Sequence, residues 1–209
     1  MTGRGSRQPV QARSVATRAA LLDAAVECLC SDGYAAVTTP EIARRAGVSR
    51  GAQLHHFPTK AELMTAAVEH LLQRRLREFR EVLEQAGSLD RVEAAVDVGW
   101  TMFQGPAFVA WVELWVAART DAELAAAMTE TDRRFTDESR LMFLEVVADL
   151  GSFDPQALEM ARDFAFAVMT GIALQRLVPR GQRPASDYLD VLKAVLGSMM
   201  DQSRVDTEA

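Results

Sequence analysis

One short stretch, residues 38–60, constrains the fold of this chain more than any other part of it. Thr38 and Glu41 have the spacing of a capping box at the start of a short helix. Gly47 follows the apolar positions of that helix and can adopt the positive φ common after a helix C-terminus. Ser49 can then cap a second short helix. This pattern predicts a helix-turn-helix, whose second helix lies in the major groove of DNA; the alternative is an ordinary corner between two helices of a bundle.

Short sequence matches extend on both sides of this motif. They are Asp32-Gly33-Tyr34, Val37-Thr38-Thr39, Ile42-Ala43, Ala46-Gly47-Val48-Ser49 and His55-His56-Phe57-Pro58, with Lys60 and Leu63. Together they make residues 17–73 similar to the N-terminal domain of the TetR family of bacterial transcriptional regulators. The resemblance implies an all-α fold, in which a three-helix DNA-binding domain is joined by a long helix to a helical domain for effector binding and dimerisation.

Helical periodicity and capping signals predict the organisation of the chain. We expect a disordered arm at 1–16, the DNA-binding domain at 17–73, the helical effector-binding and dimerisation domain at 74–204 and a tail at 205–209. Within these parts we expect helices at 17–31, 40–46, 50–57, 60–85, 89–103, 106–120, 121–150, 155–177 and 186–204. The long helix at 60–85 follows a second capping-box pair, Thr59 and Glu62, and no strand-like alternation occurs along the chain.

Charge is unevenly distributed along the sequence. The net charge of −6 divides into +4 for residues 1–60, which carry eight basic and four acidic side chains, and −10 for the rest. A basic N-terminal part and an acidic body suit a protein that binds DNA by one end. The alternative is that the surface charge is uneven by chance.

The sequence lacks the residue patterns of an enzyme or a metalloprotein. It shows no nucleophile–base constellation, no Gly-rich phosphate-binding loop and no metal-ligand spacing, so we expect no cofactor and no metal. Cys28 and Cys30 are two residues apart in a helical pattern and therefore point to different faces. The N-terminus has no apolar leader, and the longest apolar run, 106–118, contains Glu113 and is too short to span a membrane. We therefore expect a cytoplasmic protein.

The family resemblance implies which residues contact DNA. They lie on the second short helix and at the starts of the helices before and after it: Thr39, Arg50, Gly51, Ala52, Gln53, His55, His56 and Lys60. The family usually has Leu-Tyr where this chain has Gln53-Leu54. We expect Gln53 either to be partly buried with an unseen partner or to turn toward the DNA, while Leu54 cannot donate a hydrogen bond to a phosphate.

The middle helices are rich in large apolar side chains, and Trp111 and Trp115 lie one turn apart on the same face. The resemblance implies a ligand cavity among these helices, with walls that suit a small apolar or aromatic effector. The candidate lining residues are Trp100, Phe103, Phe108, Trp111, Trp115, Met128 and Phe135. Plain core packing is the alternative for these residues.

The last two helices are apolar on more than one face. A helix that is apolar around so much of its circumference must be covered on both sides. Two such helices from each of two subunits can form a four-helix bundle, which predicts a homodimer; the alternative is a thick monomeric core. The candidate interface residues are Ala167, Gly171, Leu174, Tyr188, Leu192, Val195 and Met199.

These features predict a ligand-responsive transcriptional regulator rather than an enzyme. We expect a repressor that binds a near-palindromic double-stranded DNA operator as a homodimer and is released by a small apolar or aromatic effector, with no membrane partner. The alternative is a helical ligand- or partner-binding protein whose N-terminal domain lacks sequence-specific DNA binding. The Gln53-Leu54 departure and the acidic total charge favour this alternative.

Overall fold

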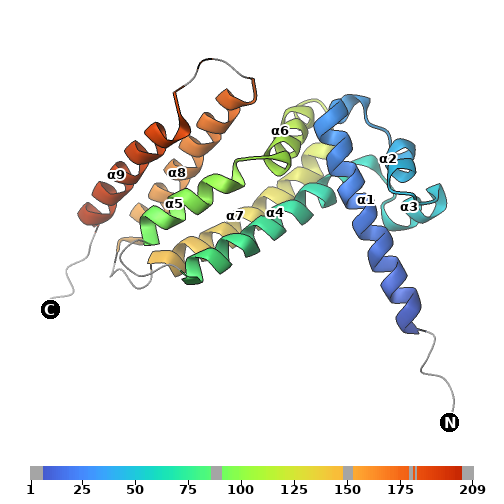
Figure 1. Cartoon of the computed structure of the whole chain (residues 1–209), viewed down its shortest axis with the longest axis horizontal. Coiled ribbons are helices and arrows are strands. Elements are labelled where there is room, and N and C mark those ends of the chain that lie inside the picture. Colours follow the sequence, from blue (N-terminus) through green and yellow to red (C-terminus); the bar gives the residue numbers. More distant parts are fainter. Residues whose placement is uncertain (1–6, 86–90, 148–152, 179–180, 182, 204–209) are drawn as a thin grey trace, which may run out of the picture. The chain divides into compact units, whose positions relative to one another are not determined.

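The computed structural model describes residues 7–85, 91–147, 153–178, 181 and 183–203 (Figure 1). The elements in this part are all α-helices, which confirms the all-α prediction. They are α1 (Arg7–Ala36), α2 (Thr39–Arg45), α3 (Arg50–His56), α4 (Lys60–Gln85), α5 (Arg91–Met102), α6 (Pro106–Ala118), α7 (Ala122–Val147), α8 (Pro155–Arg176) and α9 (Ala185–Ser203). No helix in the described part is both long and apolar enough to cross a membrane.

Helix α1 begins earlier than the sequence predicts. We expected a disordered arm before Thr17, whereas the helix already begins at Arg7. The intervening segment contains no glycine, and Pro9 falls in the first turn, where its missing N–H interrupts no helical hydrogen bond. The structure therefore differs from the prediction over most of this arm. Residues 1–6 lie outside the described part.

The described residues form two compact units. The head unit lies within residues 7–72 and 106–133, and the body unit lies within residues 73–105 and 134–203. The chain passes from the head unit to the body unit after residue 72, and α6 and the first part of α7 belong to the head unit.

Helix α1 contributes several residues to the core of the head unit. Its residues Leu21, Leu22 and Leu29 are buried, and α6 packs along it. Gly33 interrupts α1 with φ 71° and ψ 161°, a conformation that residues with a Cβ rarely adopt. Beyond this interruption Val37 is buried and precedes α2.

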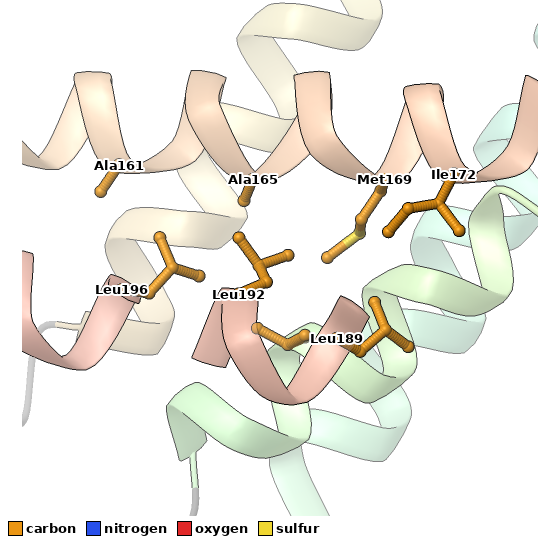
Figure 2. Close-up of a cluster of buried hydrophobic side chains, with 8 residues drawn as sticks. Ala161, Ala165, Met169, Ile172, Leu189, Leu192 and Leu196 are labelled. Atoms are coloured by element: carbon orange, nitrogen blue, oxygen red, sulfur yellow. The ribbon is translucent and has the colours of Figure 1, made fainter. Parts of the chain in front are cut away.

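The main core of the body unit lies between α8 and α9. Figure 2 shows buried side chains that point from the two helices toward one another: Ala161, Ala165, Met169 and Ile172 of α8, and Leu189, Leu192 and Leu196 of α9. Val96 of α5 completes this cluster. Because Leu192 is one of its most buried members, the prediction that it lies at a dimer interface is wrong.

Candidate functional site

Helices α2 and α3 form a tight helix-turn-helix. Helix α2 ends at Arg45, Ala46 is its C-cap, and Gly47 follows with φ 65°, as the sequence predicts. The backbone N–H of Val48 donates to the carbonyl of Ala43 at 2.9 Å, which closes the turn. The side chain of Ser49 then accepts a hydrogen bond from the N–H of Ala52 and caps α3. The structure thus contains the predicted motif.

Of the two predicted capping boxes, one forms. Between Thr59 and Glu62 both reciprocal bonds are present, each 3.1 Å long, and they fix the start of α4. Thr38 makes no side-chain cap, so the first predicted box is wrong. The carboxylate of Glu41 is instead bonded to the guanidinium groups of Arg44 and Arg45, which lower the pKa of Glu41 to about 2.

The solvent-facing side of α3 is small and basic. The exposed residues of α3 are Arg50, Gly51, Leu54 and His55. Ala52 and His56 are half-buried. Among the residues that the structure describes, Arg50 makes no hydrogen bond or ion pair, so its guanidinium is available to a phosphate or a guanine base. The small residues at positions 51 and 52 permit close approach to a DNA backbone.

Gln53 does not belong to this surface. Its side chain is 0% exposed, and its Nε2 donates to the carbonyl of Phe57 at 2.7 Å. Its Oε1 is buried and has no partner within the described structure. The first of the two expected alternatives therefore holds, and the assignment of Gln53 to the DNA-binding surface is wrong. The reason is that position 53 faces the core of the head unit, where the side-chain amide donates to the carbonyl of Phe57, the C-cap of α3.

Thr39 and Lys60 stand at the starts of α2 and α4, where the family resemblance implies phosphate contacts. Thr39 is half-buried. The ammonium of Lys60 donates to the carbonyl of Tyr34 at 2.5 Å and lies 4.1 Å from the centroid of the Tyr34 ring. Burial lowers the pKa of Lys60, and the charge of Asp121 opposes this effect. A phosphate contact by Lys60 would therefore require the bond to Tyr34 to break.

Four residues expected to line a ligand cavity lie in the head unit instead. Phe108 and Met128 are buried there. Trp111 and Trp115 stack with their ring centroids 5.7 Å apart, and Trp115 is 55% exposed. Trp111 also donates from Nε1 to Asp132, whose pKa is raised by burial. The predicted role of these four residues in the cavity described below is wrong, because α6 and the first part of α7 belong to the head unit rather than to the body unit.

The body unit contains an apolar cavity of about 70 Å³. Its walls come from five helices and the turn after α5: Leu76 and Phe79 of α4, Ala95, Val96, Gly99 and Met102 of α5, Phe103 directly after α5, Ser139, Met142 and Phe143 of α7, Arg162, Ala165, Phe166 and Met169 of α8, and Leu196 of α9. Phe103 was predicted to line it. Trp100 instead packs against the α8–α9 cluster, and Phe135 contacts the edge of the Phe166 ring, so neither lines this cavity.

Most of the residues that line the cavity were not predicted from the sequence, although one residue, Arg162, gave a signal for it. Arg162 interrupts the apolar stripe that Leu158, Ala161, Ala165 and Met169 form along α8. An arginine in such a stripe is unusual and marks a place where a polar group is buried. Periodicity alone identified a buried face of α8 but not the partners that this face meets.

Gly99 offers a way to reduce the cavity volume without disturbing its walls. A methyl group added there would lie 3.7 Å from Met169 Cε and from Phe79 Cε2, which is ordinary van der Waals contact. We expect Gly99→Ala to raise the free energy of unfolding by about 0.5–1 kcal/mol, because alanine is favoured over glycine in a helix interior. We also expect weaker binding of an apolar fluorescent dye, because the methyl group occupies part of the cavity. Urea unfolding and dye titration measure the two effects.

The matched control for this prediction is Gly197→Ala in α9. A methyl group at Gly197 meets no atom within 4 Å, so it should give a similar gain in helix stability and leave dye binding unchanged. Equal dye affinity in the Gly99→Ala protein and the wild type would contradict the assignment of the cavity as a ligand site.

The outer face of α8 and α9 is apolar and exposed in the single chain. Met160, Phe164 and Leu174 of α8 are exposed, as are Tyr188, Val191 and Val195 of α9; we call these six residues the α8–α9 outer face. They recur at helical spacing, and Ala167 and Gly171 lie along the same stripe of α8. Met199 is partly buried against the core cluster. Six of the seven predicted interface residues therefore remain candidates, and Leu192 does not.

No group of three or more His, Cys, Asp or Glu side chains among the described residues could hold a metal ion. Cys28 is buried and Cys30 is exposed, both as free thiols, and burial raises the pKa of each.

Two family models match this chain. The model described as "Bacterial regulatory proteins, tetR family" matches residues 21–67. The model described as "BetI-type transcriptional repressor, C-terminal" matches residues 90–201, more than half of the chain. The first match contains the helix-turn-helix, and the second contains most of the residues that line the cavity.

Several regulators are similar to this chain in sequence. An HTH-type transcriptional regulator of Mycobacterium tuberculosis is 36% identical over 115 residues, which are 54% of this chain and 59% of that protein. CymR of Pseudomonas putida is 34% identical over 140 residues, 66% of this chain and 69% of CymR. BetI of Stenotrophomonas maltophilia is 29% identical over 188 residues, 83% of this chain and 91% of BetI. The match thus spans less than two thirds of the length of the Mycobacterium relative.

Solved structures share the fold at lower identity. A TetR-family regulator from Rhodococcus superimposes with a TM-score of 0.71 at 22% identity and covers 89% of this chain and 99% of its own. A regulator from Saccharomonospora viridis, solved in complex with choline, has a TM-score of 0.62 at 18% identity and covers 88% of this chain and 95% of its own. At these identities the likeness establishes the fold alone.

Proposed function

Because the chain belongs to the TetR family of bacterial regulatory proteins, we propose that it is a ligand-responsive transcriptional repressor. It binds a near-palindromic operator as a homodimer in the bacterial cytoplasm, with α3 of each subunit in successive major grooves. A small, largely apolar effector enters the cavity of the body unit and lowers the affinity for the operator. The observation that carries the proposal is the exposed, unpaired Arg50 on a correctly capped α3.

The proposed release mechanism acts through α4. Leu76 and Phe79 of this helix line the cavity, and its first residue, Lys60, bonds to Tyr34 in the head unit. A ligand that favours a different position of α4 would therefore act on the helix that starts directly after the helix-turn-helix. A tenfold loss of operator affinity requires only about 1.4 kcal/mol of differential binding between the two conformations.

Selection of genomic DNA fragments by the purified protein, read out by sequencing, tests the function. Enrichment of one short palindrome would support the repressor and identify the neighbouring genes. Retention that is lost at moderate salt and enriches no common sequence would contradict it, and would favour the partner-binding alternative.

Arg50→Ala is expected to weaken operator binding by about 1–3 kcal/mol without changing the oligomeric state, because it removes a donor to guanine or phosphate at the centre of the DNA-facing surface. Fluorescence anisotropy with labelled operator measures the affinity, and sedimentation measures the mass. Arg77→Ala, which removes an exposed arginine from α4, is the matched control and should bind as the wild type does. An unchanged affinity of the Arg50→Ala protein would exclude Arg50 from the DNA contact.

A further inference from the structure

We infer that the body-unit cavity binds an apolar molecule that carries a carboxylate, and that the guanidinium of Arg162 is the group that recognises this anion. The inference deepens the proposed function, because it names the chemical class of the effector. Binding of such a molecule can nevertheless be measured without any DNA, so the inference can fail while the proposed function holds, and the reverse.

Arg162 is a buried charge in an apolar setting. Its side chain is 10% exposed, and it lies on the α8 face that also carries Ala165 and Met169. Nε and Nη2 both donate to one oxygen of Asp163, Oδ1, at 3.0 and 2.7 Å. Nη1 is buried and has no hydrogen-bond partner within the described structure. The neighbouring carboxylate therefore satisfies one edge of the guanidinium and leaves the other edge unpaired.

An unpaired edge of this kind fits a carboxylate ligand. A guanidinium remains charged at any physiological pH and presents its N–H groups as a rigid, planar fork. Nη1 and the second hydrogen of Nη2 can donate in parallel to the two oxygens of a carboxylate, which is the strongest pairing that arginine makes. Asp163 is mostly exposed, so water weakens its attraction for Arg162. The positive charge of Arg162 is therefore only partly compensated, and a second anion can still be attracted to it.

The remaining walls define the rest of the ligand. Phe79, Phe103, Phe143 and Phe166 surround the space, and no Asp or Glu lines it. The hydroxyl of Ser139 donates to the carbonyl of Thr136 at 3.0 Å. Ser139 can therefore accept a hydrogen bond from a ligand, but its own hydrogen is not available to an anion. A cationic ligand would meet the positive charge of Arg162 without a carboxylate in the walls to balance it. The walls therefore select against cations and for an apolar acid.

The cavity volume suggests short probes. One ordered water needs about 10–15 Å³ measured in the same way, so about 70 Å³ corresponds to roughly five water-sized positions. Hexanoate and benzoate are suitable acids of this size. Hexanamide and benzamide have nearly the same shape without the charge, so each acid has a matched neutral probe.

Calorimetric titration of the purified full chain with these four probes tests the inference. We expect each acid to bind the wild type at least about tenfold more tightly than its amide, because only the acid can form the bidentate charged pair. Arg162→Met should remove this preference by weakening the acid and leaving the amide nearly unchanged, whereas Arg162→Lys should retain part of it. Arg176→Met, at an exposed position of the same helix, is the control and should keep the full preference.

The variants should remain folded, because replacing a buried arginine with an apolar side chain of similar length is often neutral for stability. Thermal unfolding checks this point, and Arg162→Lys keeps the test valid if Arg162→Met does not fold. Equal affinity of the wild type for acid and amide, or no binding of either acid at millimolar concentration, would overturn the inference.

An operator-release assay separates this inference from the proposed function. If the acids bind with dependence on Arg162 but the operator stays bound, the anion site stands and the release mechanism fails. If neutral apolar molecules bind and release the operator while the acids do not bind, the proposed function stands and the anion site is wrong.

Discussion

A chain with glutamate in place of both Val191 and Val195 is expected to be a monomer. These two residues lie on the α8–α9 outer face and are 64% and 37% exposed in the single chain, so the substitutions should not disturb the fold of a subunit. In a two-fold symmetric dimer the same patch meets its own copy, and four carboxylates would be brought together without counter-charges. Like charges placed together in an interface cost several kcal/mol, so we expect the dimer dissociation constant to rise by a factor of about 100 or more.

Sedimentation velocity over a range of protein concentrations measures this change. Operator binding should fall with dimerisation, because a monomer contacts only one half-site, and circular dichroism should show the same helix content as the wild type. The matched control places glutamate at Leu141 and Leu144, which are also apolar, exposed and on one helix of the body unit. A dimeric Val191→Glu/Val195→Glu protein, or a monomeric wild type, would contradict the proposed interface.

Periodicity predicted the apolar character of α8 and α9 but not which of their faces is buried within the subunit. The sequence identifies α8 and α9 as helices that are apolar on more than one side, and the structure shows which side is left uncovered. Leu192 was assigned to the wrong side, because two adjacent apolar stripes on one helix cannot be assigned to core or surface from spacing alone. Exposed apolar patches on a single chain commonly mark an interaction surface, which is why the remaining residues are still candidates.

Helix ends were predicted best, because their signals are local. The Thr59–Glu62 box, the positive φ of Gly47 and the cap of α3 by Ser49 all form as their sequences indicate. The failed Thr38 cap is also local, since Glu41 bonds to two neighbouring arginines rather than to the start of α2.

The cavity of the body unit was predicted poorly, because its walls depend on tertiary packing. Trp111 and Trp115 do form an aromatic stack, but they lie on α6, which belongs to the head unit. Four phenylalanines line the cavity instead, from α4, α7, α8 and the turn after α5, and only one of them, Phe103, was among the expected residues. No short-range pattern distinguishes an aromatic side chain that fills a core from one that borders a cavity.

Gln53 departs from the family pattern and is fully buried, and both facts lead to a prediction about the stability of its variants. Gln53→Glu is expected to lower the free energy of unfolding of the head unit by about 3–5 kcal/mol at neutral pH, the typical cost of a buried charge without a partner. The substitution replaces the Nε2 donor with a carboxylate oxygen that faces the Phe57 carbonyl at 2.7 Å, at a site that is 0% exposed. Urea unfolding followed by circular dichroism measures the change.

The pH dependence of this variant identifies the cause. Burial raises the pKa of the introduced carboxyl in the folded state above its unfolded value of about 4.3, because the charged form is desolvated. Below that unfolded pKa the carboxyl is neutral in both states, and its O–H can donate to Phe57, so the stability is retained. As pH rises toward the folded pKa, the unfolded state loses its proton first, and stability falls by up to about 1.4 kcal/mol per pH unit.

Gln104→Glu, at an exposed position between α5 and α6, introduces the same charge without burial and should show neither the loss nor the slope. Gln53→Leu introduces the residue that the family usually has at this position, removes the unpaired Oε1 and leaves no charge, so its stability should not depend on pH in this range. A Gln53→Glu protein with wild-type stability at neutral pH would mean that the side chain can turn outward. In that case position 53 could reach DNA after all, and the buried amide would be one of two conformations rather than a fixed part of the core.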